Sequence, residues 1–208
     1  MQPAAAKQGG SPTRASDVGV VILAGGEATR FPGKLESDAG GMPLLLRVYR
    51  NVRSIGPIYV SANAALSENL ARKLDCTIVP DSRPGRGPLG GLVSTFERVS
   101  QERCFVVAGD APFVDASVYR RLLEAWTEDL AAVVAERGGR LEPLCALYDR
   151  VAFLGEARRE LAEGSGAVRA VVESLRHRRV RFSDERALGS INTAADRDAL
   201  LGLGTTSP

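Results

Sequence analysis

Short apolar runs alternate with amphipathic segments along most of the chain. Runs in which nearly every residue is apolar are typical of strands buried on both faces of a parallel sheet. Segments in which apolar residues recur every three or four positions are typical of helices that cover such a sheet. The predicted strands are Val18–Leu23, Pro57–Ser61, Cys76–Val79, Arg103–Ala108, Leu130–Ala135, Arg140–Tyr148 and Val180–Phe182.

Helices are predicted between these strands, and Asp115 is placed to cap one of them. The alternation of short strands and helices predicts an α/β fold class, a three-layer α/β/α arrangement around a Rossmann-like, mostly parallel sheet. The predicted helices are Pro43–Val52, Leu66–Leu74, Gly90–Val99, Ser117–Trp126, Val151–Ala162, Ala167–Leu175 and Ala194–Leu201.

The length of 208 residues suits one domain with a sizeable core. We expect this domain to occupy residues 17–203. Residues 1–16 are rich in Ala, Gly, Pro and Ser without an apolar period, which predicts a disordered extension without the apolar core of a signal peptide. Lys7 and Arg14 slightly resemble a transit peptide, but no amphipathic period accompanies them. Residues 204–208 are expected to form a flexible tail.

Charge and cysteine content narrow the function classes. A formal net charge of +2 argues against a protein that coats nucleic acid, and the apolar runs are too short for a transmembrane helix. The three cysteines form no C-x-x-C pair, and the single His177 has no nearby ligand partner. We interpret Cys76, Cys104 and Cys145 as buried structural thiols, which suits the reducing cytoplasm. No nucleic acid or membrane partner is expected.

The most informative segment is the glycine-containing loop after the first predicted strand. Leu23-Ala24-Gly25-Gly26 is followed by Arg30 and Lys34, so close backbone approach and fixed positive charge are available to a phosphate. A Walker A loop would need glycine at position 28 and serine or threonine at position 35, and the G-x-G-x-x-G fingerprint is also absent. The alternative is a tight turn with a solvated basic rim.

A carboxylate follows the predicted strand Arg103–Ala108. Asp110 stands where it can hold Mg²⁺ while the metal bridges phosphate oxygens, since Mg²⁺ takes one or two carboxylates together with phosphates and water. The alternative is a turn aspartate that bonds its own backbone before Pro112.

Two further strand ends carry polar residues. Asp81 precedes a loop rich in glycine and proline that includes Gly87-Pro88-Leu89, which can present backbone groups to a base or a phosphate. A plain surface loop is the alternative. Asn63 follows another strand and can bond a sugar or base, although a turn or cap residue would look the same.

The glycine-containing loop from Leu23 to Lys34 resembles the nucleotidyltransferase signature L-A-G-G-x-x-x-R-x-G-x-x-K. Together with the motifs around Asn63, Asp81, Gly87–Gly91 and Asp110, and with Glu142–Tyr148 and Ile191–Thr193, it resembles the molybdenum cofactor guanylyltransferases over Val18 to Leu201. Some positions depart from that pattern. Pro32 replaces a glycine and Lys34 lies closer to the arginine than usual. Gly109 replaces a frequent cysteine, and Ser190 and Ala194 replace an asparagine and a proline.

The resemblance implies a nucleotide-diphospho-sugar-transferase-like fold and GMP transfer from GTP to the phosphate of molybdopterin or molybdenum-molybdopterin. Arg30, Lys34 and Asp110 would be catalytic, with Mg²⁺ or Mn²⁺ on Asp110. Transient contact with other proteins of cofactor biosynthesis is also expected. The nucleotide would be bound by Leu23, Ala24, Gly25, Gly26, Lys34, Asn63, Asp81, Gly87, Pro88, Leu89 and Asp110, and the acceptor by Glu142, Pro143 and Asn192.

Two alternatives stay open at this point. One is transfer of a cytidylyl or other nucleotidyl group to molybdopterin or to another phosphate acceptor. The other is a non-catalytic nucleotide or cofactor carrier. The cationic segment Arg176–Arg181 can attract an acceptor phosphate, but we interpret it as a helix end followed by a solvated strand edge.

Overall fold

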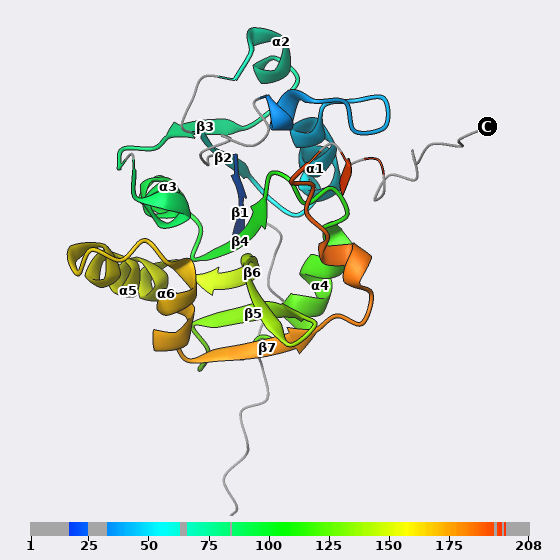
Figure 1. Ribbon diagram of the computed structural model, residues 1–208. Coiled ribbons are helices and arrows are strands. Elements are labelled where there is room, and N and C mark those ends of the chain that lie inside the picture. Colours follow the sequence, from blue (N-terminus) through cyan, green and yellow to red (C-terminus); the bar gives the residue numbers. More distant parts are fainter. Residues whose placement is uncertain are drawn as a thin grey trace, which may run out of the picture.

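A seven-stranded sheet crosses the protein, with helices on both of its faces (Figure 1). The computed structural model describes residues 17–24, 33–62, 66–83, 85–193, 195–196 and 198. The strand order is β3-β2-β1-β4-β6-β5-β7. The strands are β1 (Val18–Leu23), β2 (Ile58–Ala62), β3 (Thr77–Pro80), β4 (Arg103–Ala108), β5 (Ala132–Arg137), β6 (Arg140–Asp149) and β7 (His177–Arg181).

Most neighbouring strands are parallel, as predicted, but β6 is antiparallel to both β4 and β5. The reason is local. Only Gly138 and Gly139 separate β5 from β6, and both have positive φ (54° and 78°). A two-residue Gly-Gly connection closes a hairpin and leaves no room for a crossover helix. The sheet is mostly parallel, as predicted, and β6 is its antiparallel strand.

The helices follow the prediction in order and differ at their ends. Helix α3 begins at Gly87 rather than Gly90, because Pro88 has the φ that a first helical turn requires. Helix α2 is a single turn, and the predicted helix 194–201 lies mostly outside the described residues. The helices are α1 (Leu44–Val52), α2 (Glu68–Ala71), α3 (Gly87–Phe96), α4 (Ala116–Glu124), α5 (Arg150–Ala162) and α6 (Val168–Ser174), with 3-10 turns η2 (Lys34–Glu36) and η3 (Glu185–Leu188).

The core has two halves, one on each face of the sheet. Val20 and Ile22 of β1 belong to the half that includes α1 and α4, whereas Val21 and Leu23 belong to the half that includes α3, α5 and α6. Figure 1 shows these two groups of helices on opposite sides of the strands. All six residues of β1 are buried, as expected for a strand covered on both faces. The predicted three-layer α/β/α arrangement is confirmed.

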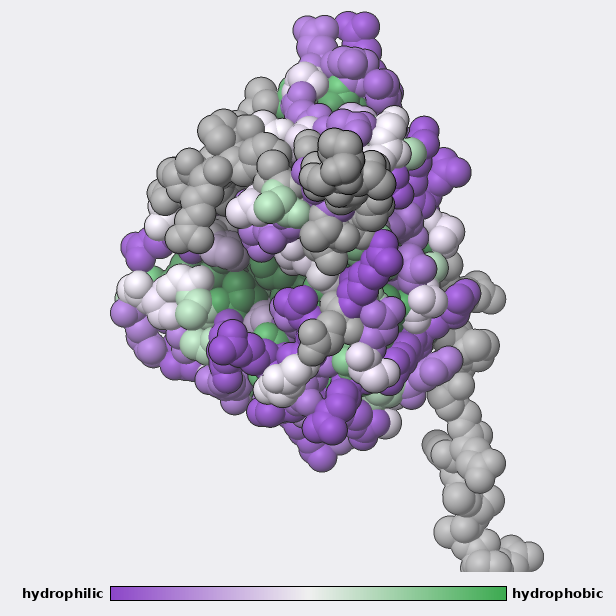
Figure 2. Space-filling model, turned by 45° about the vertical axis from the view of Figure 1, so that its right-hand side comes forward, coloured by the Kyte–Doolittle hydropathy of each residue, from purple (hydrophilic) through white to green (hydrophobic). Residues whose placement is uncertain are grey.

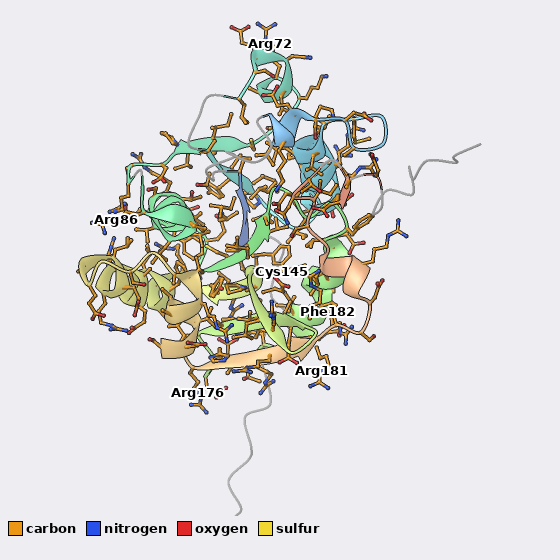
Figure 3. The ribbon with its side chains drawn as sticks, viewed as in Figure 1. Arg72, Arg86, Cys145, Arg176, Arg181 and Phe182 are labelled. Carbon is orange, nitrogen blue, oxygen red and sulfur yellow. The ribbon has the colours of Figure 1, made fainter. Side chains whose placement is uncertain are left out.

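The basic segment before and along β7 lies at the edge of the sheet. Arg176 pairs with Asp129 at 2.7 Å, and the Arg181 side chain donates to Glu136 at 3.2 Å. Figure 3 shows Arg176 and Arg181 projecting outward beside β7. Exposed charge on an edge strand hinders pairing with another chain. The arrangement agrees with a solvated strand edge.

The described residues on the face in Figure 2 are mostly polar. Figure 2 shows one face on which hydrophilic residues surround a hollow with hydrophobic surface at its base. Ile78 and Val151 are the large apolar side chains classed as exposed among the described residues. Within the same residues, no helix has the length and apolar character needed to cross a membrane.

The predicted cap of α4 is present. The Asp115 carboxylate accepts hydrogen bonds from the Ser117 N–H (2.8 Å) and the Val118 N–H (3.2 Å). Partial burial raises the pKa of this carboxyl, but the hydrogen bonds from Ser117 and Val118 outweigh burial, so the pKa lies below its ordinary value. A lowered pKa means that the cap stabilises the fold above the unfolded-state pKa and is lost as the pH falls through the folded-state pKa.

We expect Asp115→Ala to lower the free energy of unfolding by about 1 kcal/mol near pH 7, because two helix N–H groups lose their acceptor. Urea denaturation measures the change. The difference from wild type should begin to shrink below about pH 3.9, the unfolded-state pKa of aspartate, and should be lost as the pH falls further through the lower folded-state pKa. Asp115→Asn is the control, since asparagine caps without titrating. An unchanged unfolding free energy in Asp115→Ala would contradict the cap.

Candidate active site

The carboxyl ends of β3, β2, β1 and β4 meet at one edge of the sheet. Leu23, the last residue of β1, is in register with Ser61 of β2 and Ala108 of β4. The hydrogen bonding continues beyond the strands. The Ala24 N–H donates to the Ser61 carbonyl at 2.8 Å, and the Gly109 N–H donates to the Leu23 carbonyl at 2.9 Å. Ligands of open parallel sheets bind beyond this edge, and the predicted residues Leu23 and Ala24 lie there.

Lys34 and Asp110 form an ion pair at this edge. Asp110 follows β4 by two residues, and Lys34 starts the η2 turn after Gly33, whose φ is 69°. The Lys34 Nζ lies 2.5 Å from Asp110 Oδ2. The two side chains are 14% and 23% exposed, so both charges are mostly shielded from water and yet reachable by a ligand. The structure brings these two predicted site residues together across 76 positions of sequence.

Asn192 joins the same cluster. Lys34 Nζ donates to Asn192 Oδ1 at 3.1 Å, and the Ile191 N–H donates to the Asp110 carbonyl at 2.9 Å. Segments that begin near residues 34, 110 and 190 therefore meet around one ammonium group. An ammonium, a carboxylate and an amide at the carboxyl edge of a sheet can bind a phosphate and a divalent cation together.

Asp81 is held by residues on both sides of its loop. Its Oδ1 accepts from the Arg83 N–H (2.8 Å) and from the Ser94 hydroxyl (3.1 Å). Ser94 lies in α3, is 4% exposed, and also accepts from the Ser82 N–H at 3.1 Å. Oδ2 of Asp81 has no hydrogen-bond partner among the residues with described side chains. Sequence reasoning missed Ser94, although a serine one turn after Gly90 in a glycine-rich helix start is a signal that could have been followed.

The backbone of Gly91 packs closely against Ser61 and Leu23 beside Asp81. Gly91 has no side chain there, and a Cβ built on it would lie 2.8 Å from Ser61 Oγ and 4.0 Å from Asp81 Oδ2. Ser61 is fully buried, and its hydroxyl has no hydrogen-bond partner within the described part of the chain.

Four predicted site residues have no described position. Gly25, Gly26, Arg30 and Asn63 lie outside the described residues.

Comparison with known proteins decides the family. Residues 20–180 match the MobA-like NTP transferase domain. A molybdenum cofactor guanylyltransferase of Desulfosudis oleivorans is 30% identical over 175 residues, which is 83% of each chain. The chain belongs to the MobA-like NTP transferase family. A molybdenum cofactor guanylyltransferase of Cereibacter sphaeroides is also 30% identical, over 185 residues that cover 85% of this chain and 91% of the other.

The fold agrees with this membership. The molybdopterin-guanine dinucleotide biosynthesis protein A of Archaeoglobus fulgidus superposes with a TM-score of 0.75 at 22% identity, covering 89% of this chain and 97% of that one. The family and the nucleotide-diphospho-sugar-transferase-like fold inferred from sequence motifs are confirmed. This MobA-like protein is therefore an enzyme, a nucleotidyltransferase.

In this MobA-like domain, Gly87, Pro88 and Leu89 form the first turn of α3. Gly87 has a φ of 60°, which favours glycine. The Leu89 side chain is fully buried in the core, so only its backbone can face a ligand. A helix start offers unpaired N–H groups, so this turn can serve as a backbone contact, as predicted for nucleotide binding.

The two predicted acceptor residues of β6 have partners within the protein. Glu142 Oε1 accepts from Arg137 Nε at 2.9 Å, and the Pro143 carbonyl accepts from the Tyr148 hydroxyl at 2.8 Å. Because β6 is antiparallel to β4, the start of β6 lies at the same edge of the sheet as the end of β4. Glu142 and Pro143 are thus on the correct edge, without a described bond to Lys34, Asp110 or Asn192.

The cysteines are not candidates for covalent chemistry. Burial and the neighbouring Asp75 carboxylate raise the pKa of the Cys76 thiol to about 11. Burial also raises the pKa values of Cys104 and Cys145 well above the ordinary range. Thiols with such pKa values stay protonated at neutral pH and are poor nucleophiles. Cys104 and Cys145 are buried as predicted, whereas Cys76 is only partly buried.

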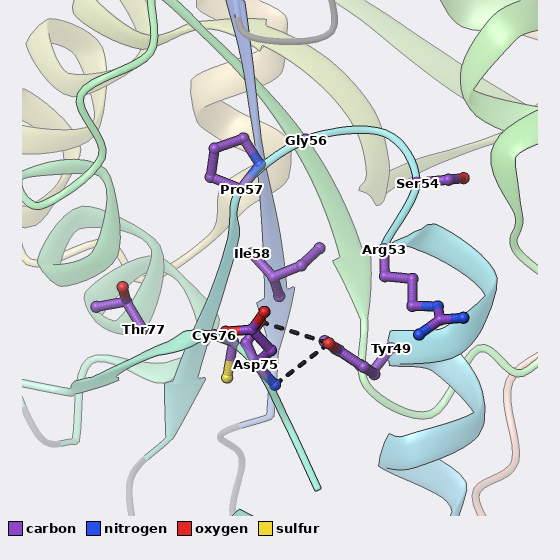
Figure 4. A pocket seen from close by; sticks show the side chains of 9 residues that line it. All are labelled: Tyr49, Arg53, Ser54, Gly56, Pro57, Ile58, Asp75, Cys76 and Thr77. Atoms are coloured by element: carbon purple, nitrogen blue, oxygen red, sulfur yellow. Dashed lines mark hydrogen bonds between the residues drawn. The ribbon is translucent and has the colours of Figure 1, made fainter.

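A separate pocket of about 640 Å³ lies away from this site (Figure 4). Pro57, Ile58 and Thr77 line it, so it is located at the amino ends of β2 and β3. The Tyr49 hydroxyl accepts from the Asp75 N–H at 3.2 Å within it. The pocket is therefore at the opposite edge of the sheet from Lys34 and Asp110.

Two helical glycines give a matched test of the packing around Asp81. A Cβ on Gly90 would lie 2.7 Å from the Arg83 carbonyl oxygen, whereas a Cβ on Gly155 in α5 would meet nothing within 4 Å. We expect Gly90→Ala to lower the free energy of unfolding by about 1–3 kcal/mol through overpacking. It should also weaken nucleotide binding, because the Arg83 N–H would shift from Asp81.

Gly155→Ala is the control and should raise the free energy of unfolding by up to about 1 kcal/mol, since alanine is the better helix former. Chemical denaturation measures the free energy of unfolding, and nucleotide titration measures the affinity. Equal stabilisation by the two substitutions would show that the contact with Arg83 does not constrain α3.

Proposed function

We propose that this enzyme transfers GMP from GTP to the phosphate of molybdopterin, or of its molybdenum-loaded form, and releases pyrophosphate. The observation that supports the proposal is the cluster of Lys34, Asp110 and Asn192 at the carboxyl edge of the sheet. Membership of the MobA-like family, with relatives named for guanylyl transfer, supports the choice of substrates.

In this reaction an oxygen of the acceptor phosphate attacks the α-phosphorus of GTP. A new P–O bond forms, and the bond between the α-phosphorus and the oxygen that bridges to the β-phosphorus breaks. The electron pair of the broken bond leaves on pyrophosphate. No covalent enzyme intermediate is needed, so the protein contributes alignment of the two phosphates and compensation of their charge.

Lys34 is the residue that offsets this charge. Its ammonium is only 14% exposed, and a cation in a partly desolvated site interacts more strongly with phosphate than one in bulk water. The ammonium is paired with the carboxylate of Asp110. A bound triphosphate would offer Lys34 additional anionic oxygens, while Arg30 would approach the transferring phosphate from the loop.

Asp110 would hold Mg²⁺. Within the described residues there is no group of three His, Cys, Asp or Glu side chains that could bind a metal without help from the substrate. A single, partly exposed carboxylate fits Mg²⁺, which commonly takes one or two carboxylates and completes its shell with phosphate oxygens and water, and Mn²⁺ accepts similar oxygen ligands. When bound, the metal would neutralise charge on the triphosphate.

Asp81 would contact the nucleoside together with Asn63. Guanine carries adjacent N–H donors on its Watson–Crick edge, and a carboxylate oxygen without another partner can accept from them. The Ser94 and Arg83 contacts keep Oδ1 of Asp81 occupied and leave Oδ2 available. Glu142, Pro143 and Asn192 would face the acceptor.

The nucleotide preference is tested by pyrophosphate release with each of four nucleoside triphosphates, with and without molybdopterin. We expect release with GTP in the presence of molybdopterin and Mg²⁺. Faster turnover with CTP than with GTP would show that the enzyme transfers a cytidylyl group and not a guanylyl group. Nucleotide binding without turnover on any acceptor would instead favour a carrier and overturn the proposal.

We expect Lys34→Ala to lower turnover by about 10²–10³-fold, because the charge that develops on the phosphates would lose its closest cation. Steady-state kinetics with GTP and molybdopterin measure the loss. Lys73→Ala is the matched control, since Lys73 is exposed and follows the short helix α2. Unchanged kinetics in Lys34→Ala would refute this role of Lys34.

Asp110→Asn should abolish Mg²⁺-dependent turnover while keeping the size of the side chain. An amide binds the metal more weakly than a carboxylate and leaves the Lys34 charge uncompensated. The measurement is a titration of activity with Mg²⁺, which compares the metal dependence of Asp110→Asn with that of the wild type. Full activity at ordinary Mg²⁺ concentrations would show that the metal is held elsewhere.

A further inference from the structure

We propose that Asn192 is a positioning residue for Lys34, and that it therefore contributes to nucleotide binding before an acceptor is present. Its side-chain oxygen holds the ammonium that would contact the triphosphate. This inference rests on the proposed function, and it assigns to Asn192 a role beyond contact with the acceptor.

The contacts of Lys34 define the geometry. An ammonium has three N–H donors and no acceptor. One donor is directed to Asp110 Oδ2 at 2.5 Å and another to Asn192 Oδ1 at 3.1 Å. Because lysine only donates, the oxygen of the Asn192 amide and not its nitrogen must face Lys34. The third donor has no described partner and is available to a phosphate.

Asn192 is fixed from the amino-terminal side by a buried neighbour. Ile191 is fully buried and packs with Ala39 and Leu44 in a small separate cluster. Its N–H donates to the Asp110 carbonyl at 2.9 Å. The backbone next to Asn192 is thereby bonded to Asp110, the residue that Lys34 also contacts.

Asn192 is fixed from the other side by Asp196. The Asp196 Oδ2 accepts from the Asn192 N–H at 3.0 Å and from the Thr193 N–H at 2.8 Å. The hydrogen bond from Asn192 is the largest cause that lowers the pKa of the Asp196 carboxyl, so that carboxyl stays ionised at neutral pH. The amide of Asn192 therefore projects from a backbone held at both ends.

Asn192 would fix the direction in which the Lys34 ammonium points. With Asp110 as its only partner, the ammonium would keep its contact with that carboxylate but would lack a second contact that fixes its direction. Asn192 provides a second, neutral acceptor that holds the ammonium at a defined angle without adding negative charge near the triphosphate. The Nδ2 group of Asn192 has no partner among the described residues and can donate to an acceptor phosphate.

The first experiment measures the affinity for GTP with Mg²⁺ and without any acceptor, by isothermal titration calorimetry. We expect Asn192→Ala to weaken binding by about 5- to 10-fold, the effect of losing one ordinary hydrogen bond. An unchanged affinity would show that Asn192 serves only the acceptor and would overturn the proposal.

Asn51→Ala is the matched control. Asn51 donates to the Pro112 carbonyl at 2.8 Å, so the same substitution removes an amide and a hydrogen bond near Asp110 without touching Lys34. GTP affinity should stay as in the wild type even if the melting temperature falls. An equal loss of affinity in Asn51→Ala would attribute the effect to general loosening and would count against the positioning role.

A double-mutant cycle tests whether Asn192 acts through Lys34. In a Lys34→Ala background, Asn192→Ala should change GTP affinity by less than about twofold, since the group that it positions is gone. Additive losses would mean that Asn192 contacts the nucleotide independently, which contradicts the proposal.

A second readout needs no nucleotide. The chain has three lysines, at positions 7, 34 and 73, so acylation by limiting acetic anhydride can be followed at each by mass spectrometry. We expect the ratio of Lys34 to Lys73 acylation to rise about fivefold in Asn192→Ala and to stay constant in Asn51→Ala. A constant ratio in Asn192→Ala would overturn the proposal.

Failure of the wild type to bind GTP would reject the proposed function alone, because the acylation ratio still decides the role of Asn192.

Discussion

Strand β1 is paired on both sides, with β2 and with β4, and the candidate site follows from these two pairings. Both are parallel, so three chain segments leave the sheet at the same edge. The register places Leu23 beside Ser61 and Ala108, and the backbone bond from Gly109 to Leu23 extends the contact beyond the strands. Complete burial of β1 between two helical layers stabilises this arrangement, because any shift would expose apolar residues of the core.

The ion pair of Lys34 and Asp110 differs from the surface pairs of this protein. The pair of Arg72 and Glu68 has side chains that are 79% and 88% exposed, and such pairs contribute little to stability. Lys34 and Asp110 are mostly shielded, so each would be costly to leave uncompensated. The two residues meet this requirement by pairing with each other. In the proposed reaction, a metal would take over Asp110 and a triphosphate would take over Lys34.

Local signals explain which elements could be predicted. Strands β1 and β4 were predicted with the observed ends, because continuous apolar runs are bounded there by polar residues and glycine. Helix α4 could be located from its Asp115 cap. The direction of β6 was missed, although Gly138-Gly139 between two apolar runs is a hairpin signal. The start of α3 was placed late because its glycine and proline were interpreted as a loop.

The sequence by itself determined the family, the alternation of strands and helices, and the candidate residues Lys34, Asp81 and Asp110, since these depend on residue types at short spacing. Only the tertiary structure decided that Lys34 binds Asp110 and Asn192, that Ser94 holds Asp81, and that Glu142 is paired with Arg137. The pair of Glu142 and Arg137 depends on how β5 and β6 pair in their hairpin, and the contacts of Lys34 depend on segments far apart in the sequence. Lys34 and Asn192 are 158 positions apart, and their contact depends on sheet register and on the burial of Ile191, which no local pattern specifies.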